Sequence, residues 1–358
     1  MKVVIRAGGV GSRLWPMSRE SRPKQLQRLI SHHTMLEDAL LRVKPLVKPE
    51  DIFVSCNMAC AAISAEVMPD IPGKNLIVEP ARRNTAAAVG LESMYIRHRD
   101  PQAIVASLGS DHSIKREDEF RRMLKMAEEF VRRHPQELVL LGVKPTYPDT
   151  GYGYISLGDS LDLYEGKNLY RVTQFTEKPS LDKAKEFMNS NQFLWNTNMF
   201  VWRVDTILDL FKQHLPDMYV LLEQIEAAID TPKEAAVLAE LYPKMEDIAV
   251  DYAILEKTGQ IAAISADIGW SDIGDWARLK DEMTDLESDN LVRAEHISVD
   301  TKNSLVYGPD KKMIVTIGVE NLVVVDTPDA LLICDKYRSI DVKKIVDQLR
   351  ENQREDLL

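Results

Sequence analysis

Short aliphatic runs alternate with longer amphipathic stretches along the amino-terminal part of the chain, and few architectures accommodate this pattern. The runs are rich in β-branched and aliphatic residues, as expected of strands buried on both faces of a sheet. The stretches between them carry apolar residues at helical spacing, as in Phe120, Leu124, Ala127 and Val131. Strands that alternate with helices predict an α/β fold with a doubly wound, mostly parallel, Rossmann-like sheet. The predicted strands are 3–7, 52–55, 76–79, 103–108 and 138–143, and the predicted helices include 85–99 and 117–133.

The pattern changes twice further along the chain. From about Gly151 strand-like segments are interspersed with helices, and from about Leu291 to Cys334 nearly every segment is a short strand punctuated by Asn, Gly or Pro. We therefore predict a large catalytic domain at 1–285 and a small all-β domain with a terminal helix at 286–358. The predicted strands of the middle region are 153–157, 170–177 and 199–204, and the predicted helices are 180–189, 206–214, a section through 217–257 and, at the end, 339–353.

Composition excludes several classes of protein. The 358 residues carry a net charge of −11 at pH 7, which argues against a nucleic-acid partner, so any phosphate site must be local. The three cysteines form no CxxC pair and are expected to be free thiols. No apolar stretch is long enough to span a bilayer, and the first strand leads straight into a loop without room for a signal peptide. We expect a cytoplasmic protein without a membrane partner, and a homodimer is one state that the sequence allows.

A glycine-rich loop follows the first strand. Glycine lets the backbone take positive φ and approach a phosphate closely, so that consecutive N–H groups point at its oxygens. A dinucleotide-binding loop would need a third glycine where this chain has Leu14, and a P-loop would need Gly-Lys-Ser/Thr. We predict a nucleotide site of another kind, in which Arg13 adds a charged fork. The predicted nucleotide-binding residues of the loop are Ala7, Gly8, Gly9, Gly11 and Ser12.

Positive charge is concentrated just downstream of the loop, at Arg19, Arg22 and Lys24. Taken alone, this cluster would be interpreted as a solvated basic turn. Next to the glycine loop, the more favoured interpretation is a set of counter-charges for a triphosphate.

The run GGVGSRLWPMSR followed by RPKQ resembles the signature of sugar-phosphate nucleotidylyltransferases, and its LWP and PKQ elements resemble the mannose-1-phosphate guanylyltransferase branch. Further segments agree in the same order. They are EP at 79–80, NTA at 84–86, DH at 111–112, GYGYI at 151–155, EKP at 177–179, WN at 195–196 and WSDxGxW at 270–276. The chain departs from the pattern where Arg6 replaces an aliphatic residue, Gly109-Ser110 replaces a Pro-Ala pair and Asn198 replaces a glycine.

This resemblance implies a nucleotidyltransferase fold, a small left-handed β-helix-like carboxyl-terminal domain and a requirement for Mg²⁺. It implies that GTP and mannose 1-phosphate react to give GDP-mannose and pyrophosphate, by in-line attack of the sugar phosphate on the α-phosphate. A phosphate monoester has a second pKa of about 6, so the attacking group is mostly a dianion at neutral pH and needs no general base. We therefore expect catalysis by positioning and charge stabilisation, from Arg13, Lys24, Asp111 and Asp272.

Two aspartates are the predicted metal ligands. Asp111 follows the strand 103–108 and so lies near the carboxyl edge, where doubly wound sheets bind ligands. Asp272 can supply a second oxygen to the same ion if the fold brings the two loops together, as the resemblance implies. For either residue alone, a turn or a helix N-cap is the alternative.

The sugar phosphate is assigned to a second group of residues: Gly153, Glu177, Lys178 and Asn196. Lys178 would hold the phosphate as a point charge, although an exposed ion pair is the alternative for such a strand end. Glu177 and Asn196 would bind hydroxyl groups, and Gly153 would allow close approach of the sugar.

Glu79, Asn84 and Thr85 are assigned to the nucleotide, since a carboxylate can accept hydrogen bonds from guanine. Trp195 is expected in the core, and Asp251 fits either the family's DYA segment or a helix cap.

Two alternatives remain open. One is a related enzyme that uses another sugar 1-phosphate or nucleotide, because Asn198 departs from the pattern near the sugar. The other is an inactive regulatory homologue, although the retained Arg13, Lys24, Asp111 and Asp272 argue against it. A hydrolase is disfavoured, because 269–274 misses the G-x-S-x-G spacing by one residue.

Overall fold

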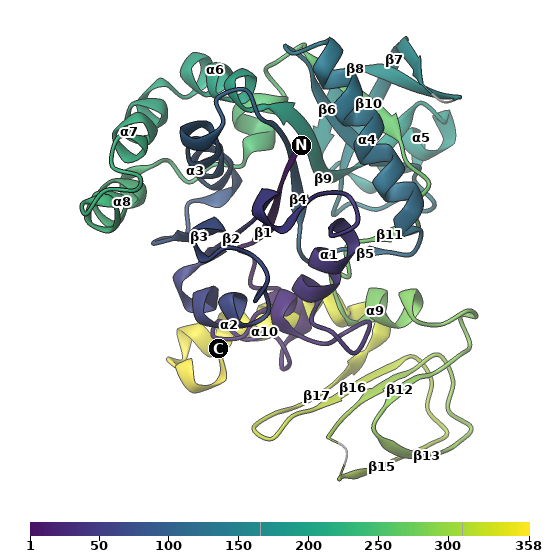
Figure 1. The fold of residues 1–358 in the computed structure, drawn as a ribbon. Coiled ribbons are helices and arrows are strands. Elements are labelled where there is room, and N and C mark those ends of the chain that lie inside the picture. Colours follow the sequence, from purple (N-terminus) through teal and green to yellow (C-terminus); the bar gives the residue numbers. More distant parts are fainter. Residues whose placement is uncertain (165, 310) are drawn as a thin grey trace.

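The computed structural model describes residues 1–164, 166–309 and 311–358, and its centre is a mixed sheet (Figure 1). Its strands are β1 Lys2–Ala7, β2 Ile52–Asn57, β3 Leu76–Glu79, β4 Ile104–Gly109, β6 Leu138–Val143, β7 Gly153–Tyr164, β8 Lys167–Glu177, β9 Phe193–Arg203 and β10 Ile261–Ser265. They lie in the order β3-β2-β1-β4-β9-β6-β10-β8-β7. All share one direction except β8 and β9, which run antiparallel to their neighbours. The predicted α/β class with a mostly parallel sheet is confirmed.

Helices cover both faces of this sheet. The first face packs on α1 Met35–Val43, α2 Ala61–Glu66, α4 Glu117–Arg133 and α5 Leu181–Ser190. The second packs on α3 Asn84–Arg99, α6 Val204–His214, α7 Pro216–Glu226 and α8 Glu234–Leu241. The apolar residues predicted to line α4, such as Phe120 and Leu124, are buried against β-strands as their spacing requires.

Some elements differ from the sequence prediction. The section 217–257 is not one helical stretch: α7 and α8 are separated by a turn at 227–233, and α8 is followed by two short helical turns, Tyr242–Lys244 and Asp251–Leu255. Pro232 and Pro243 explain the interruptions, since proline removes a backbone donor and restricts the preceding residue. The prediction also omitted α1 and β10, and β7 and β9 are longer than expected.

The carboxyl-terminal strands form parallel ladders rather than antiparallel hairpins, except for the last strand. Strands β12 Leu291–Arg293, β14 Leu305–Tyr307 and β16 Leu322–Asp326 form one parallel ladder, and β13 Glu295–Val299 and β15 Met313–Ile317 form another. Each circuit of the chain adds a strand to a ladder, as in a β-helix, which confirms the predicted β-helix-like region. Strand β17 Leu331–Asp335 closes it antiparallel to β16, and α10 Val342–Glu351 follows.

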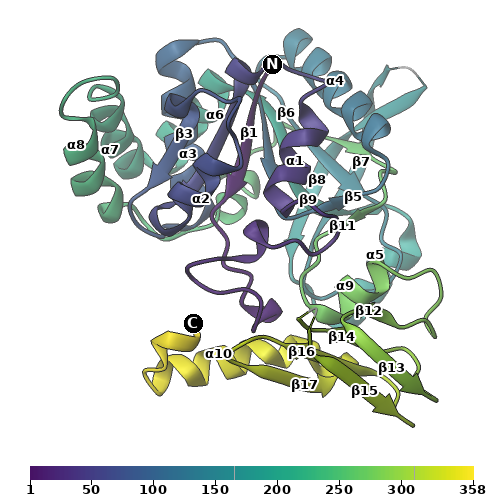
Figure 2. The ribbon, with the colours of Figure 1, turned by 60° about the horizontal axis from the view of Figure 1, so that its bottom comes forward.

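A third apolar cluster joins the two ends of the chain. Leu14 and Trp15, from the loop after β1, pack with Trp276 of α9 (Trp276–Glu282) and with Leu305 and Val323 of the β-helix-like region. The indole Nε1 of Trp276 donates to the carbonyl of Trp15 at 2.9 Å. Figure 2 shows α10 and this region lying below the purple loop that follows β1. Helix α9 therefore shares a core with the strands beyond it, and the boundary at 285 stays a prediction.

Candidate active site

A cavity of about 820 Å³ opens at the carboxyl ends of β1, β3 and β4. Every residue predicted for the site lines it except Ala7 and two of the predicted counter-charges, Arg19 and Arg22. Arg19 pairs with Asp329 at 3.0 Å instead, so of the three predicted counter-charges only Lys24 faces the cavity that the structure describes. Ala7 is buried behind the wall, and its carbonyl accepts a hydrogen bond of 2.6 Å from Gln25 Nε2. The sequence segments that the resemblance singled out therefore converge on one place, which is where parallel strands present ligands.

The glycine loop lies tightly against Lys24. Gly11 has φ +70°, and a Cβ atom at this position would collide with the Lys24 side chain. Both the left-handed backbone and the close approach require glycine here. The loop then enters a short 3-10 helix, Ser12–Leu14, which places Ser12 and Arg13 on the cavity wall.

Two very short strands bring the predicted metal ligands together. Asp111 lies just before β5 Ser113–Ile114, and Asp272 lies just after β11 Trp270–Ser271. The strands pair antiparallel, with Ser271 opposite Ser113. Lys24 Nζ links the two loops, since it lies 3.0 Å from Asp111 Oδ2 and also donates to the backbone carbonyl of Asp272.

The environment keeps both carboxylates ionised. Burial alone would raise the pKa of Asp111, but the charges of Lys24 and His112 outweigh it and lower that pKa to about 2. Burial likewise opposes ionisation of Asp272, and Arg278 and Lys24 hold its pKa below the ordinary value. The pair thus offers anionic oxygens to a cation. The helix-cap alternative for Asp272 does not hold, because Asp275 caps α9 by accepting from the Arg278 backbone at 3.1 Å.

Arg278 fixes the orientation of Asp272, a feature that the sequence interpretation missed. Its Nη1 donates to Asp272 Oδ1 at 2.8 Å and to the Tyr152 hydroxyl at 2.6 Å, while Nη2 pairs with Asp149. The Tyr152 hydroxyl also donates to Asp272 Oδ1 at 2.6 Å. This network ties the GYGYI segment to the WSDxGxW segment.

The predicted sugar residues line the part of the cavity formed by β7, β8 and β9, which is called the sugar wall below. A Cβ atom on Gly153 would overlap the Glu177 carboxylate and crowd Asn196, so the packing of these side chains requires glycine here, while the close approach of a sugar stays a prediction. Lys178 Nζ lies 2.6 Å from Glu177 Oε1, so in this structure the two form the partly exposed ion pair that was the alternative. Asn196 donates to Asp251 Oδ1 at 2.9 Å, and burial raises the pKa of Asp251 to about 6. Asp251 is thus a cavity residue rather than a helix cap.

The predicted nucleotide residues at the end of β3 are already hydrogen bonded. Glu79 accepts from Tyr242 at 2.7 Å and from Ser55 at 3.2 Å, and burial raises its pKa. Thr85 Oγ1 accepts from the backbone of Val250 at 2.9 Å. Trp195 is buried in the core, as expected.

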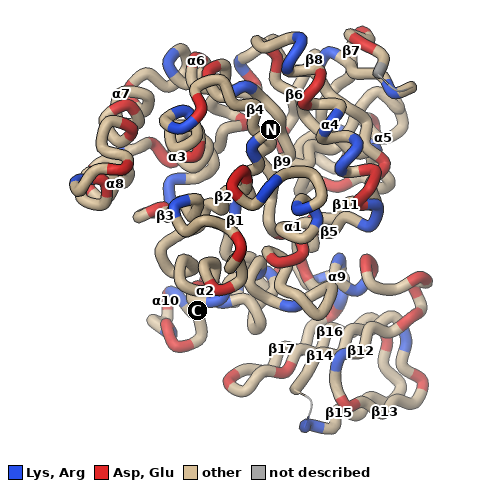
Figure 3. Tube along the Cα trace, viewed as in Figure 1, with Lys and Arg blue, Asp and Glu red and all other residues tan. Residues whose placement is uncertain are grey.

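Four cations on the cavity wall were not predicted as site residues: Arg6, Arg82, Arg83 and Lys343. Arg82 and Arg83 lie between Glu79 and Asn84, so their place in the sequence could have indicated them. Lys343 belongs to α10, and nothing in the local sequence relates it to the glycine loop. Figure 3 shows basic and acidic segments mixed along the part of the chain that the structure describes.

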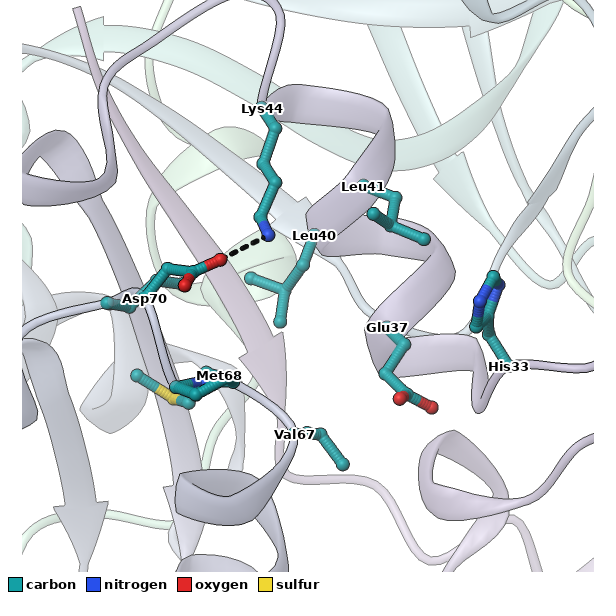
Figure 4. A pocket seen from close by; sticks show the side chains of 10 residues that line it. His33, Glu37, Leu40, Leu41, Lys44, Val67, Met68 and Asp70 are labelled. Carbon is teal, nitrogen blue, oxygen red and sulfur yellow. Dashed lines mark hydrogen bonds and ion pairs between the residues drawn. The ribbon is translucent and has the colours of Figure 1, made fainter.

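A second cavity, of about 210 Å³, lies between α1 and the segment after α2 (Figure 4). Leu40, Val67 and Met68 line it, and Lys44 pairs across it with Asp70 at 2.9 Å. It contains none of the predicted site residues, all of which belong to the larger cavity or its surroundings. None of the helices in the described part of the chain is long and apolar enough to cross a membrane.

Comparison with known proteins gives consistent results. Residues 2–289 match the nucleotidyl transferase family, and residues 294–349 match the mannose-phosphate isomerase/GMP-like β-helix domain. A mannose-1-phosphate guanylyltransferase of Salmonella muenchen is 35% identical over 99% of this chain and 74% of the relative, and one of Escherichia coli K12 is equally similar at 35%, 99% and 74%. A crystal structure from Thermus thermophilus, described as a mannose-1-phosphate geranyltransferase, superposes with a TM-score of 0.87 at 32% identity, covering 98% of this chain and 99% of that one.

Proposed function

The chain belongs to the nucleotidyl transferase family, and from this premise we propose that it joins GTP and mannose 1-phosphate to form GDP-mannose and pyrophosphate. The observation that carries the proposal is the convergence of the glycine loop, Lys24, Asp111 and Asp272 on one cavity. These segments are far apart in the sequence, and a purely structural role would not require them to meet.

The nucleotide and the sugar phosphate bind to different parts of the cavity. The loop from Gly8 to Arg13 supplies backbone N–H groups and a guanidinium for the triphosphate. Asn196 and Glu177 face it from the sugar wall, where they can bind hydroxyl groups. The sugar phosphate then meets the α-phosphate between the walls, with pyrophosphate leaving on the opposite side.

Asp111 and Asp272 fit the requirement for a divalent cation. Mg²⁺ is usually bound by one or two carboxylates together with substrate phosphates, and this pair is ionised and open to the cavity. When bound there, the ion would neutralise charge on the reacting phosphates. Lys24, which contacts the Asp111 carboxylate and the backbone carbonyl of Asp272, would stabilise the charge that develops on the α-phosphate. Arg278 acts through Asp272 and is a positioning residue.

A matrix of nucleotides and sugar 1-phosphates tests the proposal by release of pyrophosphate. We expect turnover with GTP, mannose 1-phosphate and Mg²⁺, and loss of turnover when EDTA removes the ion. Turnover only with another pair would show that GTP and mannose 1-phosphate are not the substrates. No turnover with any pair would support an inactive homologue.

One observation keeps a second sugar under consideration. The unusual residues cluster beside the sugar wall: Arg6 donates to the Asn198 carbonyl at 2.7 Å, and Asn196 donates to Asn198 Oδ1 at 3.1 Å. Since Asn198 contacts a predicted sugar ligand, a different sugar 1-phosphate is the alternative that the matrix must include.

A further inference from the structure

We propose that Lys343, on α10 of the carboxyl-terminal region, binds the β- and γ-phosphates of the nucleotide, an inference that rests on the proposed function. The β-helix-like region would then complete the nucleotide site rather than only support it.

Helix α10 lies directly against the phosphate loop. It contacts the short helix Ser12–Leu14 that follows the glycines, and Lys343 lines the same cavity as Ser12 and Arg13. Figure 2 shows the yellow helix running below the purple loop. The predicted sugar residues come from other segments, β7, β8 and β9, so the phosphates held by the loop are the group that Lys343 serves.

The position of Lys343 is fixed by contacts on both sides of it. Val342 and Val346 are buried in the apolar cluster that also holds Leu14 and Trp15. Farther along, Glu20 lies between two arginines, 3.0 Å from Arg350 of α10 and 3.7 Å from Arg82 of the cavity wall. Trp15 Nε1 also donates to the carbonyl of Leu357 at 2.8 Å. The helix therefore presents Lys343 at a defined place.

Charge distinguishes Lys343 from the next residue. Lys344 pairs with Asp341 at 2.7 Å, whereas Lys343 has no ion pair with any residue that the structure describes. Lys343 instead lines the cavity that Arg13 and Arg82 also line. Like charges at one wall repel each other until an anion binds between them, and a triphosphate supplies several negative charges.

Lys343→Met and the matched control Lys344→Met test the inference in the full-length protein at one ionic strength. We expect Lys343→Met to raise the dissociation constant for GTP, measured by calorimetry without sugar phosphate, about five- to tenfold, as for loss of one partly exposed charge-assisted hydrogen bond. Affinity for GMP, which lacks the outer phosphates, should stay within about twofold, as should the KM for mannose 1-phosphate. Lys344→Met should match the unmodified protein, and Lys343→Arg should retain most of the affinity.

Three results would overturn the inference. Equal losses of GTP affinity in Lys343→Met and Lys344→Met would mean that only long-range charge matters. An unchanged GTP affinity in Lys343→Met would show that Lys343 does not contact the nucleotide. An equal loss of affinity for GMP would show that Lys343 does not act on the β- and γ-phosphates. Failure of the unmodified protein to bind GTP would instead refute the proposed function itself, and is seen before any variant is compared.

Discussion

Single residues decide whether the cavity can hold a cation. Asp111 and Asp272 are the proposed ligands, and each neutral amide substitution keeps the shape while removing the charge. We expect Asp111→Asn and Asp272→Asn each to lower kcat/KM about a thousandfold, since charge stabilisation carries this reaction. Titration with Mn²⁺ followed by electron paramagnetic resonance should show weaker binding in both variants.

Asp118→Asn is the control, because Asp118 lies fully exposed on α4 and pairs with Arg121 on the same helix. It should bind Mn²⁺ and turn over like the unmodified protein. Unchanged Mn²⁺ binding in Asp272→Asn would show that the second ligand is wrong.

Glu92 gives a prediction about pH. It is 2% exposed on α3, and burial raises its pKa to about 8 from 4.5, with Arg6 opposing the shift. Because the folded protein holds this proton more tightly than the unfolded chain, the stabilisation is complete below about pH 4.5 and is lost as pH rises to about 8. Glutamine does not titrate, so Glu92→Gln does not lose stability in this way as pH rises. The difference in the free energy of unfolding, variant minus unmodified protein, should therefore increase by on the order of 5 kcal/mol between the low and the high end of this pH range.

Urea unfolding at several pH values between about 5 and 9 measures the difference. Glu129→Gln is the control: Glu129 is partly exposed on α4, near Arg132 and Arg133, and its variant should run parallel to the unmodified protein. Parallel curves for Glu92→Gln as well would mean that Glu92 titrates normally.

At the scale of elements, α1 depends on its first turn. Thr34 Oγ1 accepts from the Glu37 backbone at 3.2 Å, and Glu37 Oε2 accepts from the Thr34 backbone at 2.7 Å, which is a complete capping box. We expect Thr34→Ala to lower the free energy of unfolding by about 1 kcal/mol. Thr34→Ser retains the acceptor and should change it far less, and equal losses would show that the methyl group matters instead.

Elements with a local pattern could be predicted from the sequence, and elements without one could not. Helix α4 repeats its apolar residues regularly, and its predicted bounds agree with the structure. Strand β10 has only five residues, follows a turn, and is a strand because β6 and β8 lie on either side of it. Helix α1 did have a signal, the Thr34–Glu37 spacing, which the prediction overlooked.

The same distinction holds for the site. Its loop residues could be predicted because the family motifs are contiguous. Arg278 and Lys343 were missed because their roles come from packing between distant segments. Arg278 reaches from α9 to Asp149, and α10 holds Lys343 at the cavity through the third apolar cluster.

At the scale of the whole molecule, that cluster should couple the stability of the β-helix-like region to nucleotide binding. Leu305 is 1% exposed in β14, outside the cavity, and packs in the cluster that holds Leu14 and Trp15. Leu305→Ala should cost about 2 to 5 kcal/mol of stability and also raise the KM for GTP, because the phosphate loop loses support.

Leu138→Ala is the matched control, since Leu138 is equally buried but lies at the start of β6 in a different cluster. It should cost comparable stability in denaturant unfolding without changing the KM for GTP. An equal rise in KM for both variants would indicate general loosening of the protein instead of coupling through the cluster.

The pairing of β5 with β11 makes the separation of the two aspartates independent of the chain length between them. Residues 115–269 form a long excursion that leaves and returns through this four-residue ladder. An insertion in the surface turn at 227–233 would lengthen the excursion but leave its two ends clamped at the same register. Such turns are therefore where this scaffold can accept new sequence while keeping its cation-binding geometry.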